Sequence, residues 1–335
     1  MSIKKVANIA GVSIATVSRY FNNPEKVSKK TQKKVQSAID KINYSPNALA
    51  QNLRRGKTGL IIAVVPKINS PLYEPITKQL NALASEREYN LLVKESDFNS
   101  LSLDYFKTMI RCKQADGFII MTGLAPHAPN TIGERLPIVL ACEPLTTEQQ
   151  YQLPYLAINY FQAARDATHY LLENKHSTIA FIANDYSSNS ILEQQRGYLK
   201  AMSDTLEETS VAIIKPNEYS LSLQEKLNSL MQSKSKPTAI YCADDETAIE
   251  MIHWLKKNNL RIPKDISIIG FHNTRFSQWC DPPLTTVNNP LTDIGRQAME
   301  TLFEIIDYGS LKADINSFNH EIIVRKSTAI HNDHQ

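Results

Sequence analysis

Hydrophobic and polar positions follow one pattern up to about residue 58 and another from residue 59 onwards. After residue 59, short apolar runs alternate with amphipathic segments that are long enough to form helices. Continuous apolar runs are typical of strands buried on both faces, and their alternation with helices is typical of parallel α/β sheets. The predicted strands lie at residues 60–66, 89–95, 117–121, 137–142, 155–159, 178–184, 211–215, 238–244 and 266–271. Nine buried strands are too many for one small sheet, so we expect an α/β fold of two similar subdomains.

Before residue 59 the pattern is purely helical. A first short helix is expected before Gly11, which breaks it because glycine tolerates a positive φ. Ser13 is suited to cap a second helix, which ends before Pro24 because the residue preceding a proline avoids the α region. Ser28 is suited to cap a third helix. Three short helices with a tight glycine turn between the first two form a helix-turn-helix.

Residues 48–55 are strong helix formers, with Asn47 suited to cap the start of the segment and Gly56 its end. The segment is shorter than the ~12 to 15 residues at which an isolated helix is even marginal. Leu49 and Leu53 lie at positions i and i+4 with no evident core to enter. The pattern favours equally a loosely docked linker helix and a segment that folds only on a partner.

Charge is distributed unevenly between these two parts. Residues 1–58 contain twelve Lys and Arg against two Asp and Glu, a net of +10. The other 277 residues contain 25 Lys and Arg against 32 Asp and Glu, a net of −7, which gives the total of +3. A basic surface that only contacts solvent is the alternative, but this asymmetry favours a module that binds a polyanion such as nucleic acid.

Other compositional features narrow the class of protein further. No apolar run approaches the ~18 residues of a membrane span, and the N-terminus lacks the apolar segment of a signal peptide, so we expect a cytoplasmic protein. The four cysteines are widely separated and form no CxxC pair, which argues against a zinc site and a disulfide framework. We expect buried free thiols, no metal site and no cofactor.

Six segments carry a resemblance to a known family: VANIAGVSIATVSRYFNNPEKVSKKTQKKVQSAIDKINYSPNALAQNLRRGKTGLIIAVVP, NSPLYEPITKQL, ADGFIIM, KDISIIGFHN, CDPPLTTV and IGRQAMETLFEII. Through them the sequence resembles the LacI/GalR family of bacterial repressors over nearly the whole chain. The resemblance implies a homodimer that binds a palindromic double-stranded DNA operator. The second helix of each head would lie in the major groove and the hinge helix in the minor groove. A core like that of periplasmic binding proteins would sense a small-molecule effector.

The resemblance also implies how the chain is divided. Residues 1–45 form the helix-turn-helix head, residues 46–58 the hinge helix and linker, and residues 59–335 the core that binds the effector and dimerises. The N-subdomain of the core is expected at about 59–158 and 291–317, and the C-subdomain at about 159–290 and 318–335.

Family position implies a set of DNA-contacting residues. In the head these are Ser13, Ile14, Ala15, Thr16, Ser18, Arg19, Asn22, Lys26, Ser28 and Thr31, and in the hinge Asn47, Ala50, Asn52, Leu53 and Arg54. Leu53 matches the leucine with which family hinges wedge open the central base step, a deformation that costs a few kcal/mol. Val6, Ala10, Val12 and Val17 are expected to form the core of the head.

Ile14 has two interpretations that the sequence leaves open. Its i, i+3 spacing to Val17 favours burial in the core of the head. Its family position, in the first turn after the cap at Ser13, favours the DNA groove instead, where an apolar side chain contacts a thymine methyl but does not hydrogen-bond a base edge.

The predicted effector contacts are Tyr73, Cys142, Gln194, Asp245 and His272. Tyr73 falls where the family often has an aromatic residue that stacks on the ligand. Gln194 replaces a usual arginine, Cys142 a usual Asp or Asn, and His272 a usual aspartate. Losing that arginine and that aspartate removes a charge-assisted donor and a bidentate acceptor. A different effector, a protein co-regulator and the absence of any effector therefore all remain alternatives.

Two other classes of protein fit the sequence less well than a DNA-binding regulator. An enzyme is disfavoured because the sequence lacks the P-loop, GxGxxG, GxSxG and HExxH motifs. A free sugar-binding protein of the periplasm would need a signal peptide and would not begin with a basic helical head. No leucine heptad follows VRKSTAI near the end of the chain, which predicts a dimer and not a tetramer. Since the family mostly represses by occlusion, a repressor is the expected case.

Overall fold

The protein is described by a computed structural model over residues 2–44, 56–97, 100–124, 136–144, 153–183, 188–205, 210–214, 223–233, 236–309 and 318–332. It divides into two compact units, Met1–Thr58 and Gly59–Gln335. No helix among those ranges is long and apolar enough to cross a membrane.

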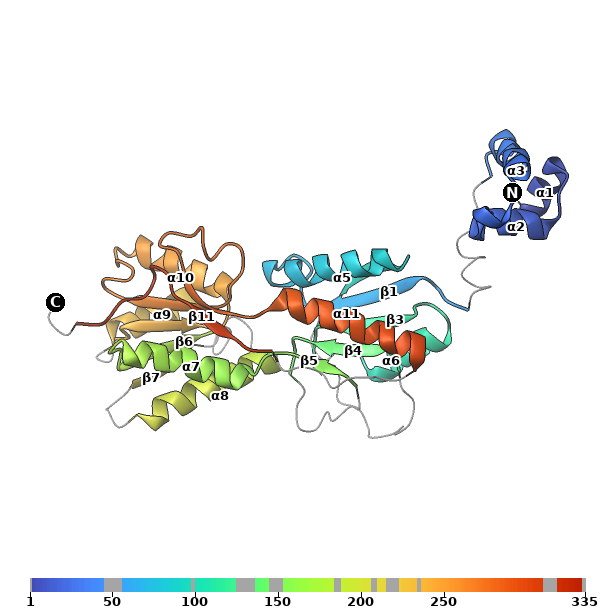
Figure 1. Cartoon of the computed structure of the whole chain (residues 1–335). Helices are drawn as coiled ribbons and strands as arrows, with labels where there is room; N and C mark the ends of the chain where they lie inside the picture. The colour runs from blue at the N-terminus through green and yellow to red at the C-terminus, as the bar shows by residue number, and fades with distance from the viewer. Residues whose placement is uncertain are drawn as a thin grey trace. The chain divides into compact units, whose positions relative to one another are not determined.

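The first unit is a bundle of short helices (Figure 1). These are α1 (Ile3–Ala10), α2 (Ile14–Asn22), the 3-10 helix η1 (Pro24–Lys26) and α3 (Lys29–Ile42). Gly11 has a φ of 63°, which allows the sharp turn between α1 and α2. The Ser13 and Ser28 side chains accept hydrogen bonds from the backbone N–H groups of Thr16 and Thr31, so each caps its helix as the sequence predicts.

The core of this unit is small and draws on all three α-helices. Val12, which lies in the turn, packs against it and is partly buried. The buried residues are Val6, Ala7, Ala10, Val17, Val35 and Ala38. The predicted core of the head is therefore observed, with α3 contributing Val35 and Ala38.

The N-subdomain of the second unit is built on a parallel sheet with strand order β2-β1-β3-β4-β5. Its strands are β1 (Leu60–Val65), β2 (Asn90–Glu95), β3 (Gly117–Ile120), β4 (Ile138–Ala141) and β5 (Tyr155–Leu156). The helices are η2 (Pro71–Tyr73), α5 (Glu74–Glu86), α6 (Leu103–Arg111) and α11 (Leu291–Tyr308). One cluster of apolar side chains joins the sheet to α5 and α11, and a second cluster joins it to α6.

The C-subdomain is built on a second sheet with strand order β11-β10-β9-β8-β6-β7, parallel except for the β10–β11 pair. Its strands are β6 (Thr178–Ile182), β7 (Ser210–Ile214), β8 (Ala239–Cys242), β9 (Ser267–His272), β10 (Thr285–Asn288) and β11 (Glu321–Ile323). Its helices are α7 (Tyr160–Glu173), α8 (Asn189–Asp204), α9 (Leu223–Gln232) and α10 (Asp245–Lys257). One apolar cluster joins the sheet to α7 and α8, and another joins it to α9 and α10.

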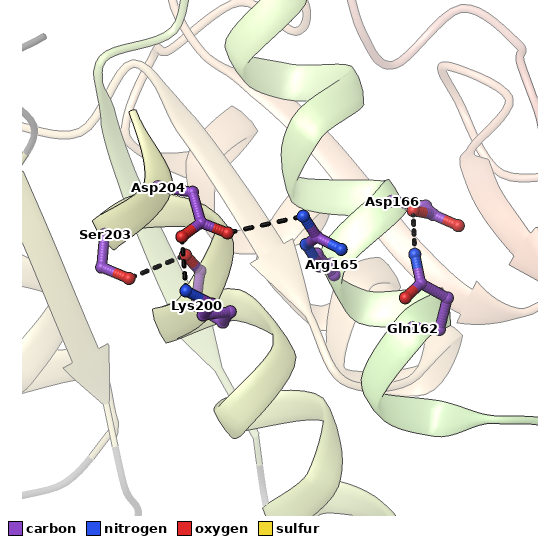
Figure 2. Close-up of polar contacts among 6 residues, drawn as sticks. All are labelled: Gln162, Arg165, Asp166, Lys200, Ser203 and Asp204. Atoms are coloured by element: carbon purple, nitrogen blue, oxygen red, sulfur yellow. Dashed lines mark hydrogen bonds and ion pairs between the residues drawn. The ribbon is translucent and has the colours of Figure 1, made fainter. Parts of the chain in front are cut away.

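Helices α7 and α8 cross closely. A Cβ atom at Gly197 would lie 2.2 Å from the backbone oxygen of Phe161, so only glycine fits there. At the C-terminal end of α8, the Asp204 carboxylate accepts hydrogen bonds from Lys200 at 2.6 Å and from Arg165 of α7 at 3.5 Å (Figure 2). These partly exposed ion pairs add little stability, and the apolar contacts between the two helices hold them together.

The fold class is confirmed, and every predicted strand is present. Two strands, β10 and β11, were not predicted. β10 follows the Asp281–Pro283 turn and contains the polar sequence Thr-Thr-Val-Asn, and β11 is only three residues long. Their pairing depends on contacts distant in sequence, because β10 is held between β9 and β11.

Candidate nucleic-acid interface and effector site

The N-terminal turn of α2 carries most of the predicted base-contacting residues. Ile14 is 40% exposed and takes no part in the buried cluster, so its interpretation as a core residue is wrong. Val17, one turn later, is fully buried. The i, i+3 spacing was misleading because Ile14 lies in the first turn, whereas Val17 faces the interior of the bundle. Ala15 and Arg19 are exposed as well.

Two Ser–Thr pairs hold the N-termini of α2 and α3. The hydroxyls of Ser13 and Thr16 lie 2.9 Å apart, and those of Ser28 and Thr31 also lie 2.9 Å apart. The uncompensated backbone N–H groups of a helix N-terminus favour a negative charge, and a phosphate is the usual occupant. These four predicted residues therefore lie at helix N-termini, which are suited to holding a phosphate, and Ser18 is half-buried.

The orientation of α2 is fixed by residues that the sequence reasoning missed. The Tyr20 hydroxyl donates to Oε1 of Gln36 on α3 at 2.5 Å, and Nε2 of Gln36 donates to Asp40. Gln32 donates from Nε2 to the backbone oxygens of Pro24 and Val27 at 2.7 and 2.8 Å, which holds the turn that carries Lys26. The helical spacing of Gln32, Gln36 and Asp40 on α3 could have indicated a polar face that contacts the neighbouring elements.

The described surface of the head is rich in positive charge. Every lysine and arginine in the described part of the head is exposed: Lys4, Lys5, Arg19, Lys26, Lys29, Lys30, Lys33, Lys34 and Lys41. The predicted hinge contacts Asn47, Ala50, Asn52, Leu53 and Arg54 lie outside the described residues, as does the side chain of Asn22.

In the second unit, residues that follow the carboxyl ends of strands from both sheets come together. Burial raises the pKa of Tyr73 well above its usual value, and the nearby Cys142 and Glu143 raise it further. The rings of Tyr160, at the start of α7, and His272, at the end of β9, lie 6.4 Å apart between centroids. Burial raises the pKa of Tyr160 well above its usual value, and the nearby Cys142, Glu143 and Tyr73 raise it further. Three of the five predicted effector residues, Tyr73, Cys142 and His272, therefore share one site.

Sequence reasoning missed Glu143, Tyr160 and Asn289 at this site. Asn289 donates from Nδ2 to the Tyr160 hydroxyl at 3.3 Å and approaches Nδ1 of His272 at 3.5 Å. Its Oδ1 is buried without a partner among the described residues. Glu143 could have been found, because ligands of parallel α/β sheets bind beyond the carboxyl ends of the strands, where Glu143 follows β4.

His272 and Cys142 are uncharged at neutral pH, whereas burial raises the pKa of Glu143 to about 7 and hydrogen bonds from Ser188, Asn189 and Ser190 act in the opposite direction. Burial lowers the pKa of His272 to about 3, which keeps its imidazole neutral. Burial also raises the pKa of the Cys142 thiol to about 12, with the charge of Glu143 acting in the same direction. Such a site can offer stacking and neutral hydrogen bonds to a ligand.

A pocket of about 420 Å³ adjoins this site and includes Tyr73 in its wall. Glu74 and Arg275 line it from the two subdomains and form an ion pair at 3.1 Å, and Phe276 adds an apolar face. Its volume lies within the range of small-molecule sites, roughly 300 to 1,000 Å³.

Comparison with known proteins identifies the family to which the chain belongs. The family model for bacterial regulatory proteins of the lacI family matches residues 2–47, and the model for a periplasmic binding protein-like domain matches residues 168–328. Catabolite control protein A of Priestia megaterium is 32% identical over 332 residues, with 98% of this chain and 99% of that protein covered. The chain belongs to the LacI family.

Other LacI-family proteins give the same result. The HTH-type transcriptional repressor CytR of Escherichia coli K12 is 30% identical over 330 residues, with 98% of this chain and 96% of that protein covered. The crystal structure of the lac repressor dimer bound to operator and the anti-inducer ONPF superposes with a TM-score of 0.80 at 22% identity, with 98% and 99% of the chains covered. The predicted family is confirmed, and the relatives are transcriptional regulators, which agrees with the expectation that the chain is not an enzyme.

Two predicted effector residues need correction for this LacI-family member. Asp245 is fully buried, and its carboxylate accepts hydrogen bonds from the Thr274 backbone N–H at 2.6 Å and from the Thr286 hydroxyl at 2.6 Å. A Cβ atom at Gly270 would lie 2.4 Å from its Oδ1. Asp245 therefore ties the loop after β9 to β10 and presents no free oxygen to a ligand.

Gln194 is likewise fully buried. Its Oε1 accepts a hydrogen bond from the Tyr241 hydroxyl at 2.9 Å, while its Nε2 has no partner among the described residues. No described contact joins Gln194 to Tyr73, Cys142 or His272. The neutral amide accepts the hydrogen bond of the buried tyrosine hydroxyl. A longer arginine side chain would bring a charge to this buried position, and that charge would need a carboxylate or solvent nearby.

Proposed function

We propose that this LacI-family regulator binds a palindromic double-stranded DNA operator as a homodimer and represses transcription by occupying it. The observation that carries the proposal is the first turn of α2, where Ile14 and Ala15 are exposed directly after the cap at Ser13. Helix-turn-helix proteins read bases with this end of the second helix. The surrounding lysines supply the electrostatic, sequence-independent part of the affinity.

Each proposed DNA contact has a distinct task. Ile14 offers only apolar surface, which suits a thymine methyl, whereas Arg19 can donate two hydrogen bonds to a guanine. Ser13 and Ser28 mark the helix N-termini that hold phosphates. The hinge, with Leu53 as the wedge, orders on the operator and couples the head to the core. Sequence preference is therefore expected to depend on Ile14 and Arg19, and affinity on the lysines.

We further propose that a small molecule bound near Tyr73, Cys142 and His272 modulates operator affinity. The pocket beside Tyr73 and the unpartnered oxygen of Asn289 support this proposal. A regulator without an effector, under the control of a protein co-regulator, is the second candidate. It is favoured by the inward orientation of Gln194 and Asp245, which removes two expected ligand contacts.

Selection of operators from random-sequence DNA by the full-length chain tests the proposal. We expect an inverted repeat to be enriched. Ile14→Ala should lose discrimination at one A·T pair in each half-site, worth about 1 to 3 kcal/mol per well-matched contact. Ile9→Ala is the matched control, because Ile9 is also 40% exposed but lies on α1. Failure to enrich any inverted repeat would overturn the proposal.

A further inference from the structure

The two subdomains of the core touch through residues that follow strand ends on both sheets; we call this contact region the junction. Ser70, after β1, donates from Oγ to Glu246 at 3.3 Å. Glu143, after β4, contacts the start of α8, which follows β6. Because these residues all follow the carboxyl ends of parallel strands, the carboxyl edges of the two sheets face each other across the junction.

Glu143 makes the most extensive of these contacts. Its Oε2 accepts hydrogen bonds from the hydroxyls of Ser188 and Ser190 at 3.0 and 3.1 Å, and its Oε1 accepts one from the backbone N–H of Asn189 at 2.5 Å. Asn189 in turn donates from Nδ2 to the backbone oxygen of Pro144 at 2.9 Å. One carboxylate of the N-subdomain is therefore held by three donors of the C-subdomain.

The contact completes the N-terminus of α8. Ser188 occupies the cap position but makes no capping hydrogen bond with its own side chain. The cap is supplied by Glu143 from the other subdomain, and a negative charge there is also favoured by the dipole of this 16-residue helix. The positions of Ser188, Asn189 and Ser190 thus form a cradle for a carboxylate, defined here as the α8 cradle.

Burial distinguishes this contact from the others at the junction. Glu143 is 8% exposed and Ser188 is 3% exposed. The side chains of the Glu74–Arg275 pair are about half exposed, so solvent screens that pair and it adds little. Three donors hold the buried Glu143 carboxyl group and favour its ionised form, so this contact is stronger than the exposed ion pair.

We propose that Glu143 is a built-in latch, which fills the α8 cradle with the protein's own carboxylate and closes the junction without an effector. The same contact determines specificity, because an effector with a carboxylate or phosphate group would have to displace Glu143 to reach these donors. The proposal concerns the core alone and does not depend on operator binding.

Native thiols report on the latch in the full-length chain. Cys142 is buried next to Glu143, whereas Cys242 is fully buried in the apolar cluster around α10. A pulse of N-ethylmaleimide, followed by quantification of each cysteine-containing peptide by mass spectrometry, measures both rates in one sample. Opening of the junction exposes Cys142 only, whereas unfolding of the core exposes both thiols.

The main variant is Ser188→Ala/Ser190→Ala, which removes two donors and keeps the Glu143 carboxyl group itself in place beside Cys142. We expect modification of Cys142 to accelerate roughly tenfold or more and that of Cys242 to stay as it is. Glu74→Gln, which breaks the exposed ion pair, is the matched control and should change the rate at Cys142 by less than about threefold. An unchanged Cys142 rate in the double variant would overturn the latch. Equal acceleration of both thiols would overturn it as well.

Chemical rescue tests the α8 cradle separately. Glu143→Ala empties it, and sodium acetate should refill it and slow the modification of Cys142, compared with sodium chloride at the same ionic strength. Glu143→Gln fills the space with a neutral amide, so acetate should not protect its Cys142. Absence of acetate protection in Glu143→Ala, or equal protection in both variants, would overturn the proposal that the cradle selects a carboxylate.

Discussion

His176 provides a quantitative test of the described core. It lies after α7 and is 3% exposed. Its Nδ1 lies 3.0 Å from the Thr238 hydroxyl, its Nε2 lies 3.0 Å from the backbone oxygen of Ala329, and its ring stacks on His331 with centroids 5.4 Å apart. A carbonyl oxygen only accepts, so Nε2 carries the proton and Nδ1 accepts from the threonine. The neutral ring thereby fastens the C-terminal segment to the sheet.

Burial lowers the pKa of His176 from 6.5 to about 4, with the nearby His331 acting in the same direction. The folded state therefore binds this proton more weakly than the unfolded state. The contribution of His176 to stability is complete above pH 6.5 and is lost as the pH falls from 6.5 towards 4. The pKa difference corresponds to about 3 kcal/mol in the free energy of unfolding.

We predict that His176→Gln flattens the dependence of melting temperature on pH in this window. Thermal unfolding of both proteins between pH 7 and pH 4 measures the effect, and the difference between the two melting temperatures should change by several degrees. Contributions from His272 and the buried carboxylates are common to both proteins and cancel. His253→Gln, at an exposed position on α10, is the control. A difference that stays constant across the window would refute the reasoning.

Three further predictions concern the proposed function. Removal of residues 1–58 should leave residues 59–335 folded and dimeric by circular dichroism and sedimentation, since they form a separate compact unit, but should abolish operator binding; retained specific binding would contradict the assignment of the head. Leu53→Ala should weaken operator binding more than binding to random DNA in anisotropy titrations, because only the operator complex gains from the wedge; equal losses would eliminate the wedge. A screen of nucleosides, sugars, uronates and phosphosugars can identify an effector by the thermal shift that it gives, and Tyr73→Leu should reduce that shift. Trp279→Leu, at an exposed position, should leave it unchanged. Equal reductions in the two variants would argue against the proposed site.

The sequence was sufficient for features that depend on local patterns. Continuous apolar runs located nine strands, and Ser13 and Ser28 cap the helices that they were expected to cap. Ile14 shows the limit of this approach, because spacing alone does not distinguish a first-turn residue at the end of a bundle from one in its middle. β10 and β11 are polar or short, and only their partners distant in the sequence make them strands.

The candidate site was harder to predict, because family position says which residue stands at a place but not what it touches. Asp245 and Gln194 occupy positions expected to face a ligand, yet Thr286 and Tyr241 engage them inside the fold. Glu143 was overlooked because its role depends on α8, which comes more than forty residues later. Contacts between subdomains leave no periodic signal in the sequence.

The latch changes what an effector has to do in this protein. A ligand shifts a conformational equilibrium only by the difference between its affinities for the two states. When Glu143 closes the junction, the closed state is already populated, so a ligand that merely fits this state adds little. A ligand that displaces Glu143 from the α8 cradle exchanges one set of hydrogen bonds for another and favours opening. Neutral residues at Gln194 and His272 are compatible with this arrangement, because the carboxylate that bridges the subdomains is already part of the chain.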